Sequence, residues 1–310
     1  MVVKDNYGRP IYNIRVSITQ KCDLNCFYCH KEGHDSVTDE MTHDEIQKII
    51  RLASDFGIKR VKITGGEPLL RHDLPKIIRS VSNIERIEDI SLVTNARTLS
   101  YDLALELREK GLNRININLP SINETTYNKI LGVELTPALD GVKAAVNSGL
   151  NPVKVNMVLL NGINSNEVYS MIDFTQKEGA ILQLIELEPL KINDSTHKKY
   201  FFPLANIEKD IAKQADDVFT RELMQNRKVY TLKNGTKIEF VRPVDNTEFC
   251  LHCTRMRLTS DGKLKPCLMS SDDLVDILTP LRNGEDEEKL RKLFLQAIKS
   301  RKPFYSEQRL

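Results

Sequence analysis

The chain alternates short hydrophobic runs with amphipathic stretches six times, and this alternation constrains its fold more than any other feature. The runs are rich in Ile, Val or Leu, as buried parallel strands are. Six strand–helix units in series predict an α/β protein with right-handed crossovers, either closed as a partial barrel or open as a doubly wound sheet. The expected strands are Asn13–Ile18, Arg60–Thr64, Ile90–Thr94, Arg114–Leu119, Val153–Leu159 and Leu182–Leu187.

The pattern changes after about residue 190. Lys191–Lys199 is polar and predicts a loop. Further on, Val229–Leu232 and Lys237–Val241 flank Asn234-Gly235, a strong signal for a β-hairpin. We therefore expect two parts, a barrel core at residues 1–220 and a smaller α+β module at residues 221–310.

Composition limits the classes of function. The N-terminus is polar without an apolar stretch, and no run is long enough to span a membrane, so we expect a cytoplasmic protein. A net charge of +2 in 310 residues predicts no general attraction to nucleic acid or membrane. In a reducing compartment the six cysteines are expected to bind metal, not to form disulfides.

The first cysteine group is Cys22, Cys26 and Cys29, with the spacing C-x3-C-x2-C. Cysteine thiolates hold iron–sulfur clusters, and three ligands leave one iron of a four-iron cluster open for chemistry. A structural zinc site is the alternative, although zinc prefers four ligands and C-x2-C spacing.

The motif Gly65-Gly66-Glu67-Pro68 directly follows the expected strand Arg60–Thr64. Two glycines at the carboxyl end of a strand permit a ligand to approach the backbone closely, and this end carries the active site in barrels. An ordinary strand-to-helix turn is the alternative.

The second cysteine group is Cys250, Cys253 and Cys267, with the spacing C-x2-C-x13-C. It predicts a second cluster, or a zinc site with His252 as the fourth ligand. Arg255 and Arg257 occupy alternate positions and therefore share one face of a strand. Two guanidinium groups on one face can grip phosphate, unless both are simply solvated.

Taken together, the two motifs Cys22–Cys29 and Gly65–Pro68 closely resemble those of the radical S-adenosylmethionine (SAM) enzymes. The second cysteine group with Arg255-x-Arg257 is similar to the MoaA family, the GTP 3′,8-cyclases of molybdenum cofactor biosynthesis. The resemblance covers nearly the whole chain. It implies a partial (β/α)6 TIM-like barrel with a C-terminal module that carries the second cluster.

The resemblance also implies site residues and cofactors. The cofactors are two [4Fe-4S] clusters and SAM. The residues expected to bind SAM are Tyr28, Gly65, Gly66, Glu67 and Asn118. The residues expected to bind GTP are Arg15, Lys62, Thr94, Lys154, Arg255 and Arg257. Taken alone, Tyr28 could equally be a packing residue.

The chain departs from the family at three places. Asn118 stands where close relatives carry Ser, and Glu188 stands where bacterial relatives carry Met near SAM. Bacterial relatives end in Gly-Gly, whereas this chain ends in residues 302–310, Lys-Pro-Phe-Tyr-Ser-Glu-Gln-Arg-Leu. The resemblance assigns no role to Glu188 or to this C-terminal segment.

The implied activity is that of a radical SAM lyase. SAM is cleaved to a 5′-deoxyadenosyl radical, which takes hydrogen from C3′ of GTP, and the product is (8S)-3′,8-cyclo-7,8-dihydroguanosine 5′-triphosphate. The implied partners are an electron donor such as flavodoxin or ferredoxin, the downstream cyclic pyranopterin monophosphate synthase, and a second copy in a homodimer. The alternatives are a radical SAM peptide-modifying enzyme with an auxiliary cluster and a zinc-stabilised binding protein.

Overall fold

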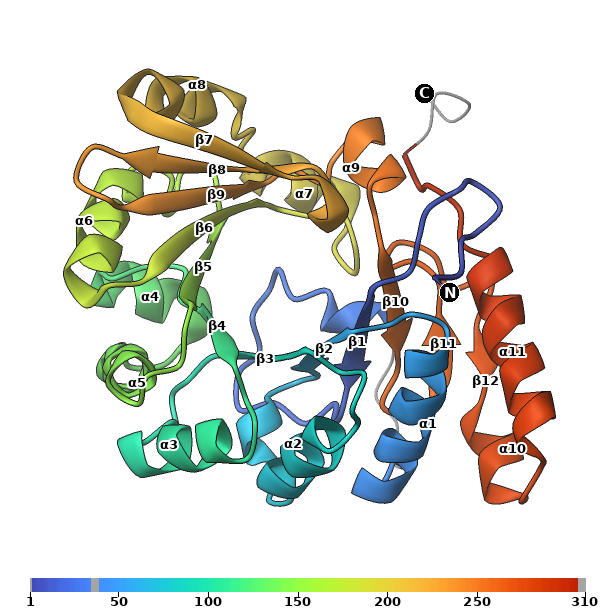
Figure 1. Ribbon diagram of the computed structural model, residues 1–310. Coiled ribbons are helices and arrows are strands. Elements are labelled where there is room, and N and C mark those ends of the chain that lie inside the picture. The colour runs from blue at the N-terminus through green and yellow to red at the C-terminus, as the bar shows by residue number, and fades with distance from the viewer. Residues whose placement is uncertain (1, 35–38, 306–310) are drawn as a thin grey trace.

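The computed structural model describes residues 2–34 and 39–305, and within them one curved sheet organises the whole chain (Figure 1). The order of its twelve strands among these residues is β12-β11-β10-β1-β2-β3-β4-β5-β6-β9-β8-β7. The strands are β1 (Asn13–Ser17), β2 (Arg60–Thr64), β3 (Asp89–Thr94), β4 (Arg114–Asn118), β5 (Val153–Leu159), β6 (Ile181–Glu186), β7 (Ala215–Arg221), β8 (Arg227–Leu232), β9 (Lys237–Val241), β10 (Arg255–Leu258), β11 (Lys263–Lys265) and β12 (Val275–Asp276).

The helices follow the strands in the order that the alternating pattern predicts. The α-helices are α1 (His43–Asp55), α2 (Leu74–Ser82), α3 (Tyr101–Glu109), α4 (Glu124–Leu131), α5 (Thr136–Asn147), α6 (Val168–Glu178), α7 (Asp194–Tyr200), α8 (Ala205–Gln214), α9 (Thr247–Leu251), α10 (Leu278–Arg282) and α11 (Glu287–Lys299). Short 3-10 helices are η1 (Lys31–Gly33), η2 (Pro68–Leu70) and η3 (Glu222–Met224).

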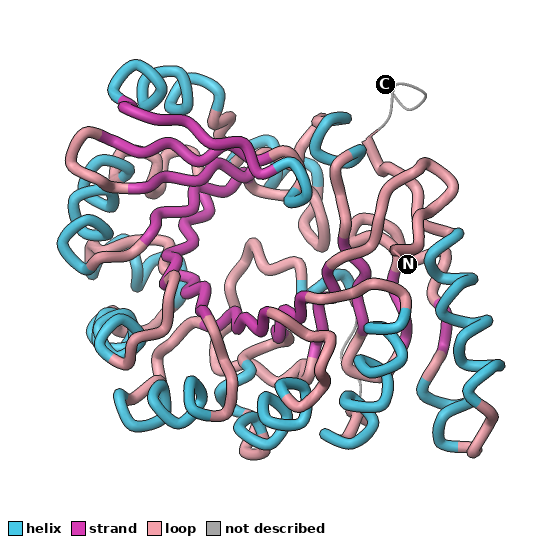
Figure 2. Tube along the Cα trace, in the orientation of Figure 1, coloured by secondary structure: helices cyan, strands magenta, loops and turns pink. Residues whose placement is uncertain are grey.

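Strands β1 to β6 are parallel and pair in chain order, as six right-handed strand–helix units require. Strand β9 extends this core in parallel beside β6, and β10 does so beside β1. Figure 2 shows the strands as an arc with helices outside it, and the sheet does not close. The expected partial (β/α)6 barrel is therefore confirmed.

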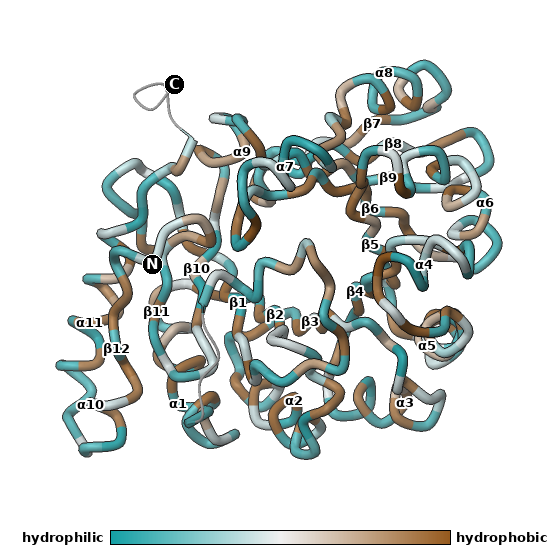
Figure 3. Tube along the Cα trace, turned by 180° about the vertical axis from the view of Figure 1, so that it is seen from behind, coloured by the Kyte–Doolittle hydropathy of each residue, from teal (hydrophilic) through white to brown (hydrophobic). Residues whose placement is uncertain are grey.

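The core lies between the sheet and the helices around it. Helix α1 shows how the sequence produces this layer, since Thr42 and Glu45 form a capping box at its start and Ile46, Ile49 and Ile50 are buried. Figure 3 shows hydrophobic and hydrophilic residues alternating along the helices, as amphipathic packing requires. None of the described helices is long and apolar enough to cross a membrane.

One local prediction is wrong. Residues 191–199 were expected to form a loop, but helix α7 begins at Asp194, because the Asn193 side chain accepts a hydrogen bond from the backbone N–H of Thr196. The helix has no buried residue, so its sequence lacks the hydrophobic periodicity that would have predicted it.

The expected division at residues 220 and 221 stays a prediction. After α8, the strands β7, β8 and β9 extend one edge of the sheet, and β10, β11 and β12 extend the other. The C-terminal part thus lengthens the barrel sheet at both ends. The expectation about the chain's last residues falls partly on 306–310, which lie outside the described residues.

Candidate active site

One cavity inside the arc of strands brings the two cysteine groups together. All six cysteines line it. It is also lined by ten of the other residues expected at the site, Arg15, Tyr28, Lys62, Gly65, Gly66, Glu67, Asn118, Lys154, Arg255 and Arg257. Lys302, Phe304 and Tyr305 line it too, so the segment before the chain end borders the same space.

The first cysteine group lies in the loop that follows β1, and its thiols are free and at least partly exposed. The backbone N–H of Leu24 lies 3.4 Å from Cys22 Sγ, and the N–H of Lys31 lies 3.4 Å from Cys29 Sγ. Burial raises the pKa of Cys22 to about 11 and that of Cys26 to about 12. These thiols stay protonated at neutral pH unless a metal binds them, because a metal deprotonates the thiol that it coordinates.

Gly65 and Gly66 let this loop approach the end of β2. A Cβ atom on Gly65 would lie 2.4 Å from the carbonyl oxygen of Thr19, and one on Gly66 would lie 2.1 Å from that of Lys21. The backbone N–H of Gly66 donates to Thr19 over 2.8 Å, and that of Glu67 donates to Lys21 over 2.7 Å. The glycines therefore make room for the cysteine loop itself.

Glu67 is 2% exposed and is held by three donors. Its carboxylate accepts from the Thr94 hydroxyl at 2.6 Å and from the backbone N–H groups of Asn95 at 2.7 Å and Leu69 at 3.0 Å. Burial raises the pKa of Glu67 to about 7. Thr94, expected to bind GTP, does not line the cavity, because its buried hydroxyl is turned to Glu67. The expected contact of Thr94 with GTP stays a prediction.

Two further residues on the SAM side have defined neighbours. The Tyr28 ring packs edge-on against Phe27 with 5.5 Å between ring centroids. The side-chain oxygen of Asn118 accepts from Asn156 at 3.0 Å. Glu188 also lines the cavity, and its Oε2 is buried without a hydrogen-bond partner among the described residues.

The second cysteine group is distributed over three segments. Cys250 lies in α9, Cys253 just before β10, and Cys267 just after β11. Burial raises the pKa of Cys250 and of Cys267. Burial acts in the same direction on Cys253, but Arg301 and Arg255 outweigh it and lower the pKa of that thiol.

Two buried arginines hold the backbone of this second group. Arg9 donates to the carbonyl oxygen of Cys250 at 2.8 Å, and Arg301 donates to that of Cys253. Asp5 joins the two arginines, at 2.8 Å from Arg9 Nε and 3.0 Å from Arg301 Nη1. The N-terminal and C-terminal segments thus meet behind the second cysteine group.

The donor set fits iron–sulfur clusters better than zinc. His252 does not line the cavity that all six cysteines line, and its Nδ1 is hydrogen-bonded to the carbonyl oxygen of Glu248 at 2.9 Å. Across residues 2–34 and 39–305, no three His, Cys, Asp or Glu side chains converge as ligands of a single ion. In a four-iron cluster each thiolate binds its own iron, so its ligands stand further apart. Three thiolates in each group match that requirement.

A row of cations crosses the sheet beside the cysteine groups. Arg257, Arg15 and Lys62 are register partners on β10, β1 and β2, and neighbouring strands lie about 4.8 Å apart. Burial and then the nearby Arg114 lower the pKa of Lys62, whose ammonium donates to Asn116 at 3.2 Å. A bound polyanion would relieve this repulsion.

Arg255 extends the row, and its guanidinium donates to the neutral Gln225 side chain at 3.2 Å. Burial and then Arg257 lower the pKa of Arg255 to about 9. Arg255 and Lys62 are therefore partly buried cations that an anionic ligand would stabilise.

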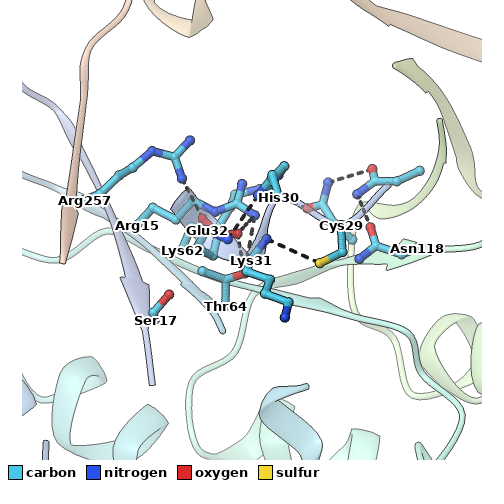
Figure 4. Close-up of polar contacts among 12 residues, drawn as sticks. Arg15, Ser17, Cys29, His30, Lys31, Glu32, Lys62, Thr64, Asn118 and Arg257 are labelled. Carbon is cyan, nitrogen blue, oxygen red and sulfur yellow. Dashed lines mark hydrogen bonds and ion pairs between the residues drawn. The ribbon is translucent and has the colours of Figure 1, made fainter. Parts of the chain in front are cut away.

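Two buried glutamates that sequence reasoning missed organise the remaining cations. Glu32 accepts from Arg15 and from Arg257, each at 2.5 Å (Figure 4). Glu239 on β9 pairs with Lys154, with Arg221 at 2.9 Å and with Arg227 at 3.3 Å.

The sequence offers only a weak signal for these two residues. Glu239 is a charged residue in the otherwise hydrophobic run Ile238–Val241, which indicates a buried charge that needs a partner. Glu32 lies in a polar loop, where a carboxylate is unremarkable.

Comparison with known families gives two adjoining matches. Residues 16–175 match the Radical SAM superfamily, and residues 180–307 match Molybdenum Cofactor Synthesis C. A probable GTP 3′,8-cyclase of Methanocaldococcus jannaschii is 48% identical over 305 residues, which are 98% of this chain and 99% of that relative. This chain belongs to the radical SAM family of GTP 3′,8-cyclases. A probable GTP 3′,8-cyclase of Methanococcus vannielii is 47% identical over 303 residues, 97% of this chain and 99% of the relative.

Solved structures place this family member on the expected fold. The Streptococcus suis protein SuiB bound to precursor peptide SuiA superposes with a TM-score of 0.68 and 16% identity, over 99% of this chain and 67% of that chain. The anSMEcpe protein with bound AdoMet gives 0.62 and 14%, over 86% and 77%. At these identities the likeness shows the shared fold alone.

Proposed function

We propose that this radical SAM lyase cyclises GTP to (8S)-3′,8-cyclo-7,8-dihydroguanosine 5′-triphosphate, an early step of molybdenum cofactor biosynthesis. The observation that carries the proposal is the meeting of both three-cysteine groups and a row of cations in one cavity. Relatives that are alike over their full length and are named probable GTP 3′,8-cyclases support the same activity.

On the SAM side, Cys22, Cys26 and Cys29 would hold one [4Fe-4S] cluster, and three thiolates would leave it a position for SAM. Gly65 and Gly66 line the cavity, and their backbone is proposed to bind the SAM amino group. Tyr28 and Asn118 border the same part of the proposed site, while Glu67 fixes the motif from behind. When bound, this cluster and SAM supply a carbon-centred radical that removes a hydrogen atom from the substrate.

On the substrate side, Cys250, Cys253 and Cys267 hold the second [4Fe-4S] cluster, beside which we place the guanine base. A triphosphate carries about four negative charges, and converging cations bind such a group most strongly where water is excluded. The proposed phosphate ligands are Arg15, Lys62, Lys154, Arg255 and Arg257, all of which line the cavity.

The hydrophobic lining of the cavity also suits radical chemistry. Tyr28, Phe249 and Phe304 line the cavity together with aliphatic side chains. Such walls exclude water from a reactive intermediate and strengthen every charge interaction inside.

Several partners belong to the proposal. We infer a cytoplasmic location, a reducing protein such as flavodoxin or ferredoxin as electron donor, and cyclic pyranopterin monophosphate synthase as the next enzyme. A homodimer and the division of the chain into a core at 1–220 and a module at 221–310 are also proposed. Nucleic acid and membrane are not expected partners, given a net charge of +2.

The activity is tested with nucleotides that carry deuterium at C3′. The anaerobic enzyme with SAM and reductant should move deuterium from GTP into 5′-deoxyadenosine and form the cyclised product. ATP should be inert, because a site that pairs with the guanine edge rejects a base that lacks it by several powers of ten. Deuterium transfer from a labelled peptide and from no nucleotide would instead establish a peptide-modifying enzyme.

A further inference from the structure

The short turn Lys31–Gly33 has an unusual backbone. Its three residues all have positive φ values, 47° at Lys31, 53° at Glu32 and 74° at Gly33. Non-glycine residues in this region are strained and persist only where their surroundings hold them. This strained turn places the Glu32 carboxylate in the interior of the protein, where Glu32 is only 6% exposed.

The turn contacts both cysteine groups. On one side, the backbone N–H of Lys31 lies 3.4 Å from Cys29 Sγ. On the other side, a Cβ atom on Gly33 would lie 2.7 Å from the carbonyl oxygen of Leu268, the neighbour of Cys267. The hydroxyl of Ser271 donates to the carbonyl oxygen of Gly33 at 3.3 Å. The turn is therefore a direct physical link between the two cysteine loops.

Glu32 ties this link to three strands (Figure 4). Its Oε1 accepts from Arg15 of β1 at 2.5 Å and from the Thr64 hydroxyl of β2 at 3.0 Å. Its Oε2 accepts from Arg257 of β10 at 2.5 Å. Arg15 and Arg257 are register partners, so without the carboxylate two like charges would face each other across neighbouring strands.

We propose that Glu32 is a positioning residue that fastens the SAM-side cysteine loop to the substrate-side arginines and so fixes the distance between the two halves of the site. The inference rests on the proposed cyclisation and adds to it a residue that touches neither cluster. Each guanidinium keeps N–H donors beyond those given to Glu32, because Arg carries five. The arginines can therefore hold phosphate while Glu32 holds them.

Loss of the Glu32 charge should reduce product formation without weakening the binding of GTP. Glu32→Gln leaves the cavity more positive, so the attraction for a triphosphate is maintained or increased. The two arginines, however, repel each other and are no longer fixed relative to Cys29. Because a misplacement of about 1 Å can cost about a hundredfold in a reaction step, SAM should then be cleaved without a matching yield of cyclised GTP.

The experiment compares the parent holoenzyme with Glu32→Gln and with Glu208→Gln. Glu208 is the matched control, because it pairs with Arg242 at 2.7 Å and does not line the cavity. Iron and sulfide content establish that both clusters are present. Equilibrium binding of GTP and of SAM, without reductant, gives a readout that is independent of turnover. Turnover then gives the ratio of cyclised product to 5′-deoxyadenosine.

We expect Glu32→Gln to retain both clusters and to bind GTP and SAM no more weakly than the parent does. Its ratio of cyclised product to 5′-deoxyadenosine should be at least about tenfold lower, and up to about a hundredfold lower if the groups move by about 1 Å. Glu208→Gln should match the parent in every measurement. An unchanged ratio, or a loss of GTP affinity that accounts for the whole loss of product, overturns the inference.

Two precautions keep the result decisive. If Glu32→Gln fails to retain its clusters, Glu32→Asp replaces it, since Asp keeps the charge but is too short to reach both arginines. The same ratio and affinities then decide the case. A parent enzyme that forms no cyclised GTP contradicts the proposed function instead, so failure of the two proposals can be told apart.

Discussion

The carbonyl oxygen of Lys21 occupies the position where Gly66 would carry a side chain. A Cβ atom there would lie 2.1 Å from that oxygen, and the neighbouring Glu67 N–H already donates to it at 2.7 Å. The loop that carries Cys22 is therefore seated directly on the end of β2.

Gly66→Ala should displace this loop and lose the first cluster. We expect about half of the parent's iron and sulfide, since one of two equal clusters is lost, and no cleavage of SAM. Gly132→Ala is the control, because Gly132 has a positive φ of 74° but nothing within 4 Å of the added Cβ. Iron analysis and assay of 5′-deoxyadenosine provide the measurement, and a Gly66→Ala enzyme with full iron would contradict the role of this contact.

Replacing each cysteine group in turn should separate the two clusters. The triple Ala variant of Cys22, Cys26 and Cys29 should retain one cluster and cleave no SAM. The triple Ala variant of Cys250, Cys253 and Cys267 should also retain one cluster, yet cleave some SAM without product. Zinc at one atom per chain and no sulfide in the parent would rule out this assignment.

Arg255→Ala should weaken GTP binding, because the triphosphate would lose a charge-assisted contact worth about 1.5–3 kcal/mol. Arg255→Lys should restore only part of the affinity, since Lys lacks the planar fork. Arg282→Ala is the control, because Arg282 pairs with Glu45 and Asp39 and does not line the cavity. Calorimetry on the anaerobic enzyme measures the affinities, and equal values for parent and Arg255→Ala would exclude the contact.

Lys154 should make GTP binding sensitive to pH. Burial, which outweighs Glu239, lowers the pKa of Lys154 to about 8. GTP affinity should therefore fall as the pH rises from about 7 to about 9, as the ammonium loses its charge. The free energy of unfolding of the free enzyme should change in the opposite direction. It should increase as the pH rises from about 8 to about 10.5, because in this range Lys154 binds a proton in the unfolded chain and has released it in the folded one.

Lys154→Arg provides the comparison, since Arg stays charged over this whole range. Its GTP affinity should depend less on pH than that of the parent. Titrations at the two pH values test this, and identical pH dependence in both enzymes would show that Lys154 does not titrate in the site.

Asp5→Ala should destabilise the fold and the second cluster together. The change leaves Arg9 and Arg301 buried at 5% and 1% exposure without their shared carboxylate. Removing one partner of a buried ion pair costs about 3–5 kcal/mol. Denaturant unfolding of the metal-free chain measures this loss, and Asp286→Ala, which removes only the cap of α11, should cost about 1 kcal/mol.

Much of the fold follows from periodicity in the sequence. The boundaries of β2 and β5 agree with the expected strands, because each is a hydrophobic run bounded by turn residues. Strand β7 escaped prediction, since it is largely exposed and begins with Ala-Asp-Asp. Its structure depends on pairing with β8, which is a tertiary property.

The site was predictable wherever a spacing encodes chemistry. The six cysteines and Arg255-x-Arg257 are spaced motifs, and the cavity contains all of them. Glu32 could not be predicted, because its partners Arg15 and Arg257 become neighbours only through the parallel pairing of β1 with β10. The hydrogen bond from Thr94 to Glu67 could not be predicted either, because a strand end does not reveal which neighbour its hydroxyl contacts.

The pairing of β1 with β10 also governs how the protein is made. Translation produces β1 first, while its outer neighbour lies in the last fifth of the chain. On the ribosome, the loop with Cys22, Cys26 and Cys29 is therefore attached to an unpaired sheet edge, and pairing over such a sequence distance is slow. The machinery that delivers iron and sulfur to a nascent chain would meet only half of the final ligands. The second cluster can accordingly be assembled only after Cys267 has been synthesised, whereas the three ligands of the first cluster lie together near the N-terminus.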